Sequence, residues 1–160
     1  MNESTDMAGR VCLVTGANSG IGKATALSLA KRGATVVMVC RNRDRGEVAR
    51  ADIVKQSGSA SIDLRITDLS SQSAIHQLAE VVKATYPVLH VLINNAGLNL
   101  SRRTMTVDGI ETTFAVNHLA PFLLSQLLFD VLKAAPARII NITSGLVQPI
   151  AFDDLRSEKR

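Results

Sequence analysis

The sequence predicts an α/β protein in which a doubly wound parallel sheet of about five strands is covered by helices on both faces. Short apolar runs alternate with amphipathic segments along the chain, as expected for repeated strand and helix units. The run 35–40 is apolar at almost every position, which is typical of a parallel strand buried on both faces. A glycine-rich turn, residues 16–22, joins the first apolar run to an alanine-rich helical pattern.

The strands follow from the apolar runs. We expect them at 11–14, 35–40, 61–66, 88–93 and 137–142. The third run alternates between apolar and polar residues, so this strand is expected to be less deeply buried than its neighbours. Ligands of such sheets bind at the carboxyl ends of the strands, near the point where the strand order reverses.

The first two helices are bounded by glycines. The first follows the glycine-rich turn and extends to about Arg32, where Gly33 stops it. The second covers about 43–56 and ends at Ser57-Gly58. Its expected buried stripe is Val48, Ala51 and Val54.

The later helices are marked by caps and prolines. The third starts near Ser70 or Ser71 and ends before Pro87. Its expected buried residues are Ile75, Leu78 and Val82. A long helical region is expected over about 107–133, with a kink or break at Pro121 because an interior proline costs about 3 kcal/mol.

Composition indicates a single globular domain. The chain has 160 residues, 46% of them hydrophobic and 20% charged, and no apolar run approaches the roughly 18 residues that cross a bilayer. Residues 1–9 are expected to form a polar leader that is not a secretory signal, and 151–160 a charged tail, so the expected location is cytoplasmic. Cys12 and Cys40 lie in apolar runs and are expected to be buried thiols, and the three histidines lack the spacing of metal ligands.

A cluster of arginines suggests, but does not favour, a nucleic-acid-binding protein. Four of them fall within ten residues: Arg41, Arg43, Arg45 and Arg50. Acidic residues are interleaved with them, and only 3% of the chain is aromatic, so bases would find few stacking platforms. The cluster is better explained as a solvated helix face, with Arg41 at the end of a strand as a separate case.

The glycine-rich turn is suited to holding a phosphate. Free backbone N–H groups and the positive end of a helix dipole meet there, and glycines allow a pyrophosphate to approach the backbone. Gly16, Gly20 and Gly22 do not follow the G-x-G-x-x-G spacing. A phosphate-binding loop of the Walker type would need glycine at Ala17 and serine or threonine at Ala24.

Four motifs resemble the short-chain dehydrogenase/reductase family, and in particular its retinol-dehydrogenase-like branch. Thr15 to Gly22 matches T-G-x-x-x-G-I-G, and Asn94 to Gly97 matches N-N-A-G. Asn117 to Phe122 matches N-H-L-x-x-F, and Asn141 to Ser144 matches N-x-[ST]-S. The resemblance implies a Rossmann-like fold and hydride transfer between NADP(H), or alternatively NAD(H), and an alcohol/carbonyl pair.

The resemblance also implies roles for individual residues. The implied cofactor-binding residues are Gly16, Asn18, Ser19, Gly20, Ile21, Gly22, Arg41, Asn42, Asp68, Leu69, Asn95, Ala96 and Gly97. Arg41, about twenty residues past the glycine turn, would select NADP by pairing with its extra phosphate, a role that Arg43 and Lys23 could share. Asp68 would lie near the adenine ring, or else cap a helix. Ser144 would be the catalytic serine on the substrate oxygen, and Asn117 would hold a water in a proton relay.

One family feature is not found in these 160 residues. The family's general acid/base is a tyrosine in Y-x-x-x-K, about a dozen residues past the serine. Tyr86, the chain's one tyrosine, precedes Pro87 and cannot be that residue. We therefore expect an incomplete, truncated Rossmann domain over 1–160, whose status as an enzyme is open. The alternative is a catalytically silent dinucleotide-binding fragment that lacks the tyrosine and lysine.

The incomplete sheet has a physical consequence. Without a further parallel strand, the fifth strand would leave an apolar edge unpaired, which favours association with another copy or another chain. We expect a nicotinamide dinucleotide and a small alcohol or carbonyl as partners, possible homo-oligomers, and no nucleic acid or membrane span.

Overall fold

A computed structural model of the chain describes residues 6–145, 152 and 154. Its centre is a parallel sheet with the strand order β3-β2-β1-β4-β5. The strands are β1 (Val11–Thr15), β2 (Thr35–Cys40), β3 (Ile62–Ile66), β4 (Val91–Asn94) and β5 (Arg138–Asn141). The order reverses between β1 and β4, so the predicted doubly wound topology is confirmed.

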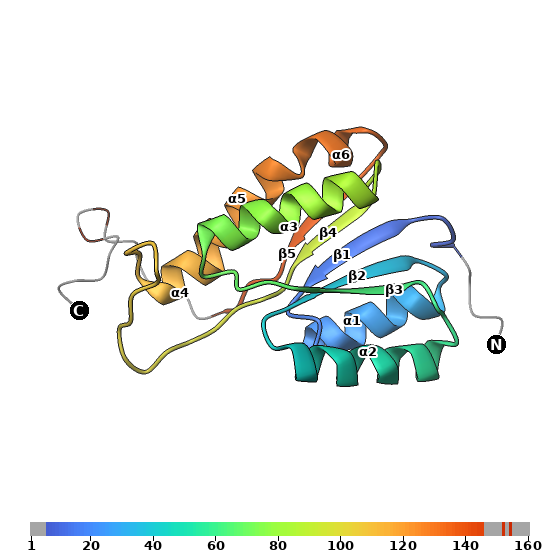
Figure 1. Cartoon of the computed structure of the whole chain (residues 1–160), viewed down its shortest axis with the longest axis horizontal. Coiled ribbons are helices and arrows are strands. Elements are labelled where there is room, and N and C mark those ends of the chain that lie inside the picture. Colours follow the sequence, from blue (N-terminus) through green and yellow to red (C-terminus); the bar gives the residue numbers. More distant parts are fainter. Residues whose placement is uncertain (1–5, 146–151, 153, 155–160) are drawn as a thin grey trace.

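Helices cover both faces of this sheet (Figure 1). On one side lie α1 (Gly20–Lys31) and α2 (Arg43–Ser57). On the other lie α3 (Gln72–Thr85), α5 (Ala120–Leu127) and α6 (Phe129–Lys133), with the short helix α4 (Thr112–Phe114) and a π-helical turn η1 (Ala115–Leu119) leading into α5.

The pleat of the strands divides the core into two layers. In β2, Val37 and Val39 face the layer with α3, α5 and α6, whereas Val36, Met38 and Cys40 face α1 and α2. All five side chains are at most 2% exposed. This two-sided burial is why the run contains no alternating polar positions.

The predicted buried stripe of α2 was wrong. Val48 is 71% exposed, whereas the buried residues are Gly46, Ala49 and Ile53. A Cβ on Gly46 would lie 3.0 Å from a methyl group of Leu64, so the missing side chain lets the helix lie close to the sheet. A hydrophobicity pattern cannot find this stripe because its first member is a glycine.

The long helix predicted over 107–133 was also partly wrong. Residues 106–110 form a turn in which Gly109 has φ +70° and its N–H donates to the Thr106 carbonyl. Helix begins only at Thr112. Pro121 lies in the first turn of α5, directly after η1, so the ladder is irregular just before the residue that cannot donate to it.

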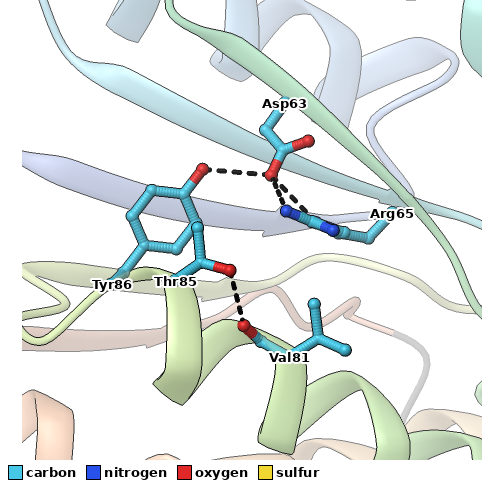
Figure 2. A network of polar contacts seen from close by, with 5 residues as sticks. All are labelled: Asp63, Arg65, Val81, Thr85 and Tyr86. Atoms are coloured by element: carbon cyan, nitrogen blue, oxygen red, sulfur yellow. Dashed lines mark hydrogen bonds and ion pairs between the residues drawn. The ribbon is translucent and has the colours of Figure 1, made fainter.

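The two sheet edges differ in how they are covered. At β3, the Tyr86 hydroxyl donates to Asp63 at 3.0 Å, and Arg65 pairs with the same carboxylate, so a polar network links the end of α3 to the edge strand (Figure 2). All four residues of β5 are exposed, Ile139 to 44% and Ile140 to 40%. Among the described strands β5 pairs only with β4, so the apolar edge predicted at the fifth strand is present there.

The remaining boundaries agree with the sequence to within a few residues. Ser71 caps α3 by accepting a bond from the Ala74 N–H, and Gly58 ends α2 with φ +70°. Of the predicted leader, residues 1–5 lie outside the described part of the chain, and Asp6 pairs with Arg32 at the end of α1. The predicted tail 151–160 lies outside the described residues except for positions 152 and 154.

Candidate functional site

The glycine-rich turn leads into the N-terminus of α1, a helix of 12 residues. Ser19 precedes the helix, and its side chain caps none of the backbone N–H groups in the part of the chain that the structure describes. The first turn, residues 20–23, contains no acidic side chain. A Cβ on Gly20, which has φ +53°, would meet no described atom within 4 Å. The helix end therefore offers N–H groups and a positive dipole to an anion without a competing carboxylate.

The same turn is fastened to the end of β4. The Asn95 side-chain amide donates to the Thr15 carbonyl at 2.8 Å and to the Gly16 carbonyl at 3.4 Å. The Thr15 hydroxyl accepts the backbone N–H groups of Asn95 and Ala96, both at 2.9 Å. A Cβ on Gly22 would lie 2.4 Å from Asn95 Nδ2 and 2.5 Å from the Gly16 carbonyl oxygen, so only glycine fits there.

A second polar cluster joins the ends of β4 and β5. The buried Asn94 side chain donates to Asn141 Oδ1 at 2.9 Å and to Ser125 Oγ at 3.4 Å. The Ser125 hydroxyl in turn donates to the Pro121 carbonyl at 2.6 Å. The cluster fixes β5, and with it the approach to Ser144, relative to α5.

Asn117 lies in η1 and holds the segment that follows β4. Its Oδ1 accepts the Leu98 N–H at 2.9 Å, and its Nδ2 donates to the Leu98 carbonyl at 2.8 Å. Both ends of this amide therefore bind backbone, which stabilises residues 97–98 at the edge of the cleft. The expected water-holding role of Asn117 stays a prediction.

These groups surround one large cleft at the carboxyl ends of the strands. Its volume is about 1750 Å³, above the roughly 300–1,000 Å³ of common small-ligand sites. Of the predicted site residues it is lined by Gly16, Asn18, Ser19, Gly20, Ile21, Gly22, Arg41, Asp68, Leu69, Asn95, Ala96, Gly97, Asn117 and Ser144. The fold thus brings together residues from five separate strand ends.

Asn42 is the one predicted site residue that is not among the described residues lining the cleft. Its side chain caps α2 by accepting the Arg45 N–H at 2.9 Å. Asp68 does line the cleft, and its Oδ1 accepts the Ser70 N–H at 2.9 Å. The alternative that Asp68 caps α3 was wrong, because Ser71 is the capping residue.

The candidate phosphate-selecting cations separate in space. Arg41 is exposed and lines the cleft where β2 ends. Lys23 pairs with Asp52 of α2 at 2.6 Å, and neither Lys23 nor Arg43 is among the described residues that line the cleft. Of the three, only Arg41 is among the described residues that line the cleft.

Several lining residues were missed in the sequence. Thr67 is buried at the end of β3, and Val39 lies near the end of β2. His118 also lines the cleft, where its ring stacks on Phe114 with centroids 5.3 Å apart. The four-residue spacing of Phe114 and His118 on one helical face could have indicated this contact.

Other reactive side chains are not among the described residues that line the cleft. Burial raises the pKa of the Cys12 thiol to about 11 and that of the Cys40 thiol to about 11, so neither is a nucleophile at neutral pH. Tyr86 is bonded to Asp63 and is not among the described lining residues. Within residues 6–145, 152 and 154, no cluster of three metal-ligating side chains occurs. No described helix is long and apolar enough to cross a membrane.

The sequence of the chain is similar to a known protein family and to several of its members. Residues 10–151 match the family model described as short chain dehydrogenase. Dehydrogenase/reductase SDR family member 12 from Homo sapiens is 49% identical over 154 residues, which cover 94% of this chain and 48% of that protein. Human retinol dehydrogenase 12 is 44% identical over 160 residues, covering 98% and 51% of the two chains. The chain spans about half the length of the curated relatives it matches.

Solved structures give the same fold. A metagenomic short-chain oxidoreductase in complex with NADP superimposes with a TM-score of 0.79 at 35% identity, covering 92% of this chain and 68% of that one. The RhlG/NADP active-site complex from Pseudomonas aeruginosa gives 0.77 at 28% identity, covering 98% and 64%.

Proposed function

This chain belongs to the short-chain dehydrogenase family, and on that premise we propose that it binds NADP(H) and serves hydride transfer between this cofactor and an alcohol/carbonyl pair. The observation that carries the proposal is the N-terminus of α1, where no capping or acidic side chain of the first turn competes for the backbone N–H groups. This helix end opens on a large cleft, with Arg41 at the end of the neighbouring strand. A dinucleotide phosphate needs this combination of free N–H groups and glycines.

The residues divide into two ends of the proposed site. The turn from Gly16 to Gly22 would hold the pyrophosphate, and Arg41 and Asp68 would contact the adenosine half. Leu69 and Asn18 would contribute to the walls, as expected from the family resemblance. Arg41 supports a preference for NADP, because a guanidinium forms paired, charge-assisted bonds with a phosphate.

The other end would receive the nicotinamide and the substrate. The bound cofactor would supply or accept a hydride, and Ser144 would hold the substrate oxygen that gains or loses a proton. Residues 94–98 would form the wall beside them, and Asn117 holds Leu98 within this wall. Tyr86 would not serve as the proton donor, because its hydroxyl donates to Asp63 at the β3 edge and it is not among the described residues that line the cleft.

The proposal also covers the location of the chain, its association and its substrate. We propose that residues 1–160 act as one dinucleotide-binding domain in the cytoplasm. The exposed edge of β5 supports association with another copy or another chain. The chain's substrate would be a small alcohol or carbonyl compound.

Fluorescence titration with NADPH and NADH tests cofactor binding. We expect NADPH to bind more tightly than NADH, and Arg41→Ala to weaken NADPH about tenfold while changing NADH less than twofold. Arg45→Ala is the matched control, because Arg45 is exposed on α2 and is not among the described lining residues. Equal loss for both nucleotides would remove Arg41 from the selecting role.

An assay with retinol and simple alcohols in the same samples tests the reaction. Turnover would support the oxidoreductase and require a proton donor other than Tyr86. Binding without turnover would favour the alternative, a catalytically silent dinucleotide-binding module. Absence of binding to either nucleotide would contradict the proposal.

A further inference from the structure

The segment between β4 and α4 ends in a turn that carries two acidic residues with different partners. Residues 104 and 112 approach each other through their side-chain oxygens at 2.8 Å, and Met105 and Glu111 form an antiparallel bridge. Asp108, at the tip, accepts the backbone N–H of Gln72 at 2.8 Å and so binds the start of α3. Glu111 binds a different helix.

Glu111 is 7% exposed, which is unusual for a carboxylate. One carboxylate oxygen accepts the Thr113 N–H at 2.9 Å, and the other accepts the Phe114 N–H at 2.7 Å. The carboxylate therefore satisfies two of the N–H groups that the first turn of a helix leaves free. The bonds it accepts and the nearby Arg103 charge lower its pKa against the opposing effect of burial, so it is ionised at neutral pH.

The helix that Glu111 caps leads directly to one end of the cleft. Thr113, Val116 and Asn117 follow within six residues and line the cleft. Asn117 then fixes Leu98 through two hydrogen bonds. The backbone of α4 and η1 therefore connects the capped helix start to Asn117, and the Asn117 hydrogen bonds continue this connection to the cleft wall formed by residues 97–98. None of the described contacts in this connection involves the glycine-rich turn or Arg41.

We infer that Glu111 is a positioning residue that holds the Asn117–Leu98 wall in place and thereby supports only the nicotinamide half of the cleft. The inference rests on the proposed function for the identity of the ligand. The predicted effect on Leu98 does not depend on any ligand. If the cap is lost, the first turn of the helix frays, and Asn117 loses its fixed position. The adenosine half, built from other strand ends, stays intact.

Two measurements on the 160-residue chain test this inference. The first is amide hydrogen exchange of Leu98 by NMR, which needs no ligand. In Glu111→Ala we expect Leu98 to exchange about fivefold faster or more, with Leu13 in β1 unchanged. The second compares NADPH with adenosine 2′,5′-bisphosphate, which lacks the nicotinamide half. We expect NADPH to bind about fivefold more weakly and the bisphosphate to change less than twofold.

Three further variants sharpen the comparison. Glu111→Asp keeps a carboxylate of a preferred capping type and should restore both readouts to near wild type. Asp108→Ala removes the other carboxylate of the same turn, bound to α3, and should leave Leu98 exchange unchanged. If Glu111→Ala does not fold, Glu111→Gln, which keeps one acceptor oxygen, should give the same pattern at smaller amplitude.

The outcomes separate this inference from the proposed function. Unchanged Leu98 exchange in the Glu111 variants overturns the inference, and so does an equal acceleration of Leu98 and Leu13. Parallel weakening of NADPH and the bisphosphate overturns its assignment to one half of the cleft. If the wild-type chain binds neither ligand, the proposed function fails, and Leu98 exchange alone decides whether Glu111 positions the wall.

Discussion

Gly22 lies where the glycine-rich turn packs against the end of β4, and this close contact depends on the absence of a side chain. Its φ angle lies outside the left-handed region, so alanine meets no backbone strain there. The added methyl group would nevertheless lie 2.4 Å from Asn95 Nδ2 and 2.5 Å from the Gly16 carbonyl oxygen. Gly22→Ala is therefore a purely steric test of the contact between the glycine-rich turn and the end of β4.

The expected cost follows from two terms. Forcing a methyl group into a packed site costs about 1–3 kcal/mol. Displacing the Asn95 amide weakens its bond to the Thr15 carbonyl, now 2.8 Å, at about 1 kcal/mol. Together they predict a loss of about 3 kcal/mol in the free energy of unfolding, or roughly 10 °C in Tm.

Thermal unfolding followed by circular dichroism measures this loss, with Gly20→Ala as the matched control. Gly20 has φ +53°, so alanine there costs about 1 kcal/mol in backbone strain. Its methyl group would meet no described atom within 4 Å. We expect Gly20→Ala to lower Tm by only about 3 °C but to weaken NADPH binding, because the methyl group occupies the space needed by a phosphate. A Tm for Gly22→Ala within about 2 °C of wild type would refute the steric argument.

Three further predictions concern other parts of the molecule. Burial and the Arg10 charge lower the pKa of His90, whose Nδ1 accepts the Val11 N–H at 3.0 Å. The stability supplied by neutral His90 should therefore be complete above the pKa of about 6.5 in the unfolded chain, and it should be lost as the pH falls through the lower pKa in the folded chain. The difference in Tm between pH 7.5 and pH 5.5 should be larger for the wild type than for His90→Gln. Tyr86→Phe should cost about 1 kcal/mol in urea unfolding through the lost bond to Asp63, and an unchanged midpoint would show that this bond contributes nothing. If copies associate through β5, Tm should rise with protein concentration, and Ile140→Lys should abolish that rise; a concentration-independent melt of the wild type would contradict the association.

The sequence predicted the features that depend on local chemistry. Three features could be predicted because each leaves a short signature in the sequence: the positions of the strands along the chain, the end of α1 at Gly33 and the cap of α3 at Ser71. The cleft was also predictable in outline. Its predicted residues stand at strand ends, and parallel strands bring those ends to one edge of the sheet.

The errors arose where a residue's role depends on a distant partner. The stripe of α2 contains Gly46, whose burial depends on Leu64 of β3, on the sheet face that α2 covers. Asn42 stands beside Arg41 in the sequence, but its side-chain oxygen accepts the Arg45 N–H at the start of α2, and its predicted contact with a cofactor stays a prediction. In the predicted helix over 107–133, the Asp108-Gly109 pair forms a turn instead, and Asp108 bonds to Gln72 on α3, 36 residues earlier.

The sequence by itself therefore determined that the chain alternates strands and helices around a glycine-rich, phosphate-suited turn, because these properties are encoded in neighbouring residues. Only the tertiary structure decided how the turn is held. Thr15 and Asn95 are 80 residues apart, and their hydrogen bonds close the turn against β4. It also decided that Glu111 is buried and bonded to two N–H groups, and that β5 leaves its side chains exposed. Such contacts depend on the distance between atoms after folding, which no pattern of neighbouring residues specifies.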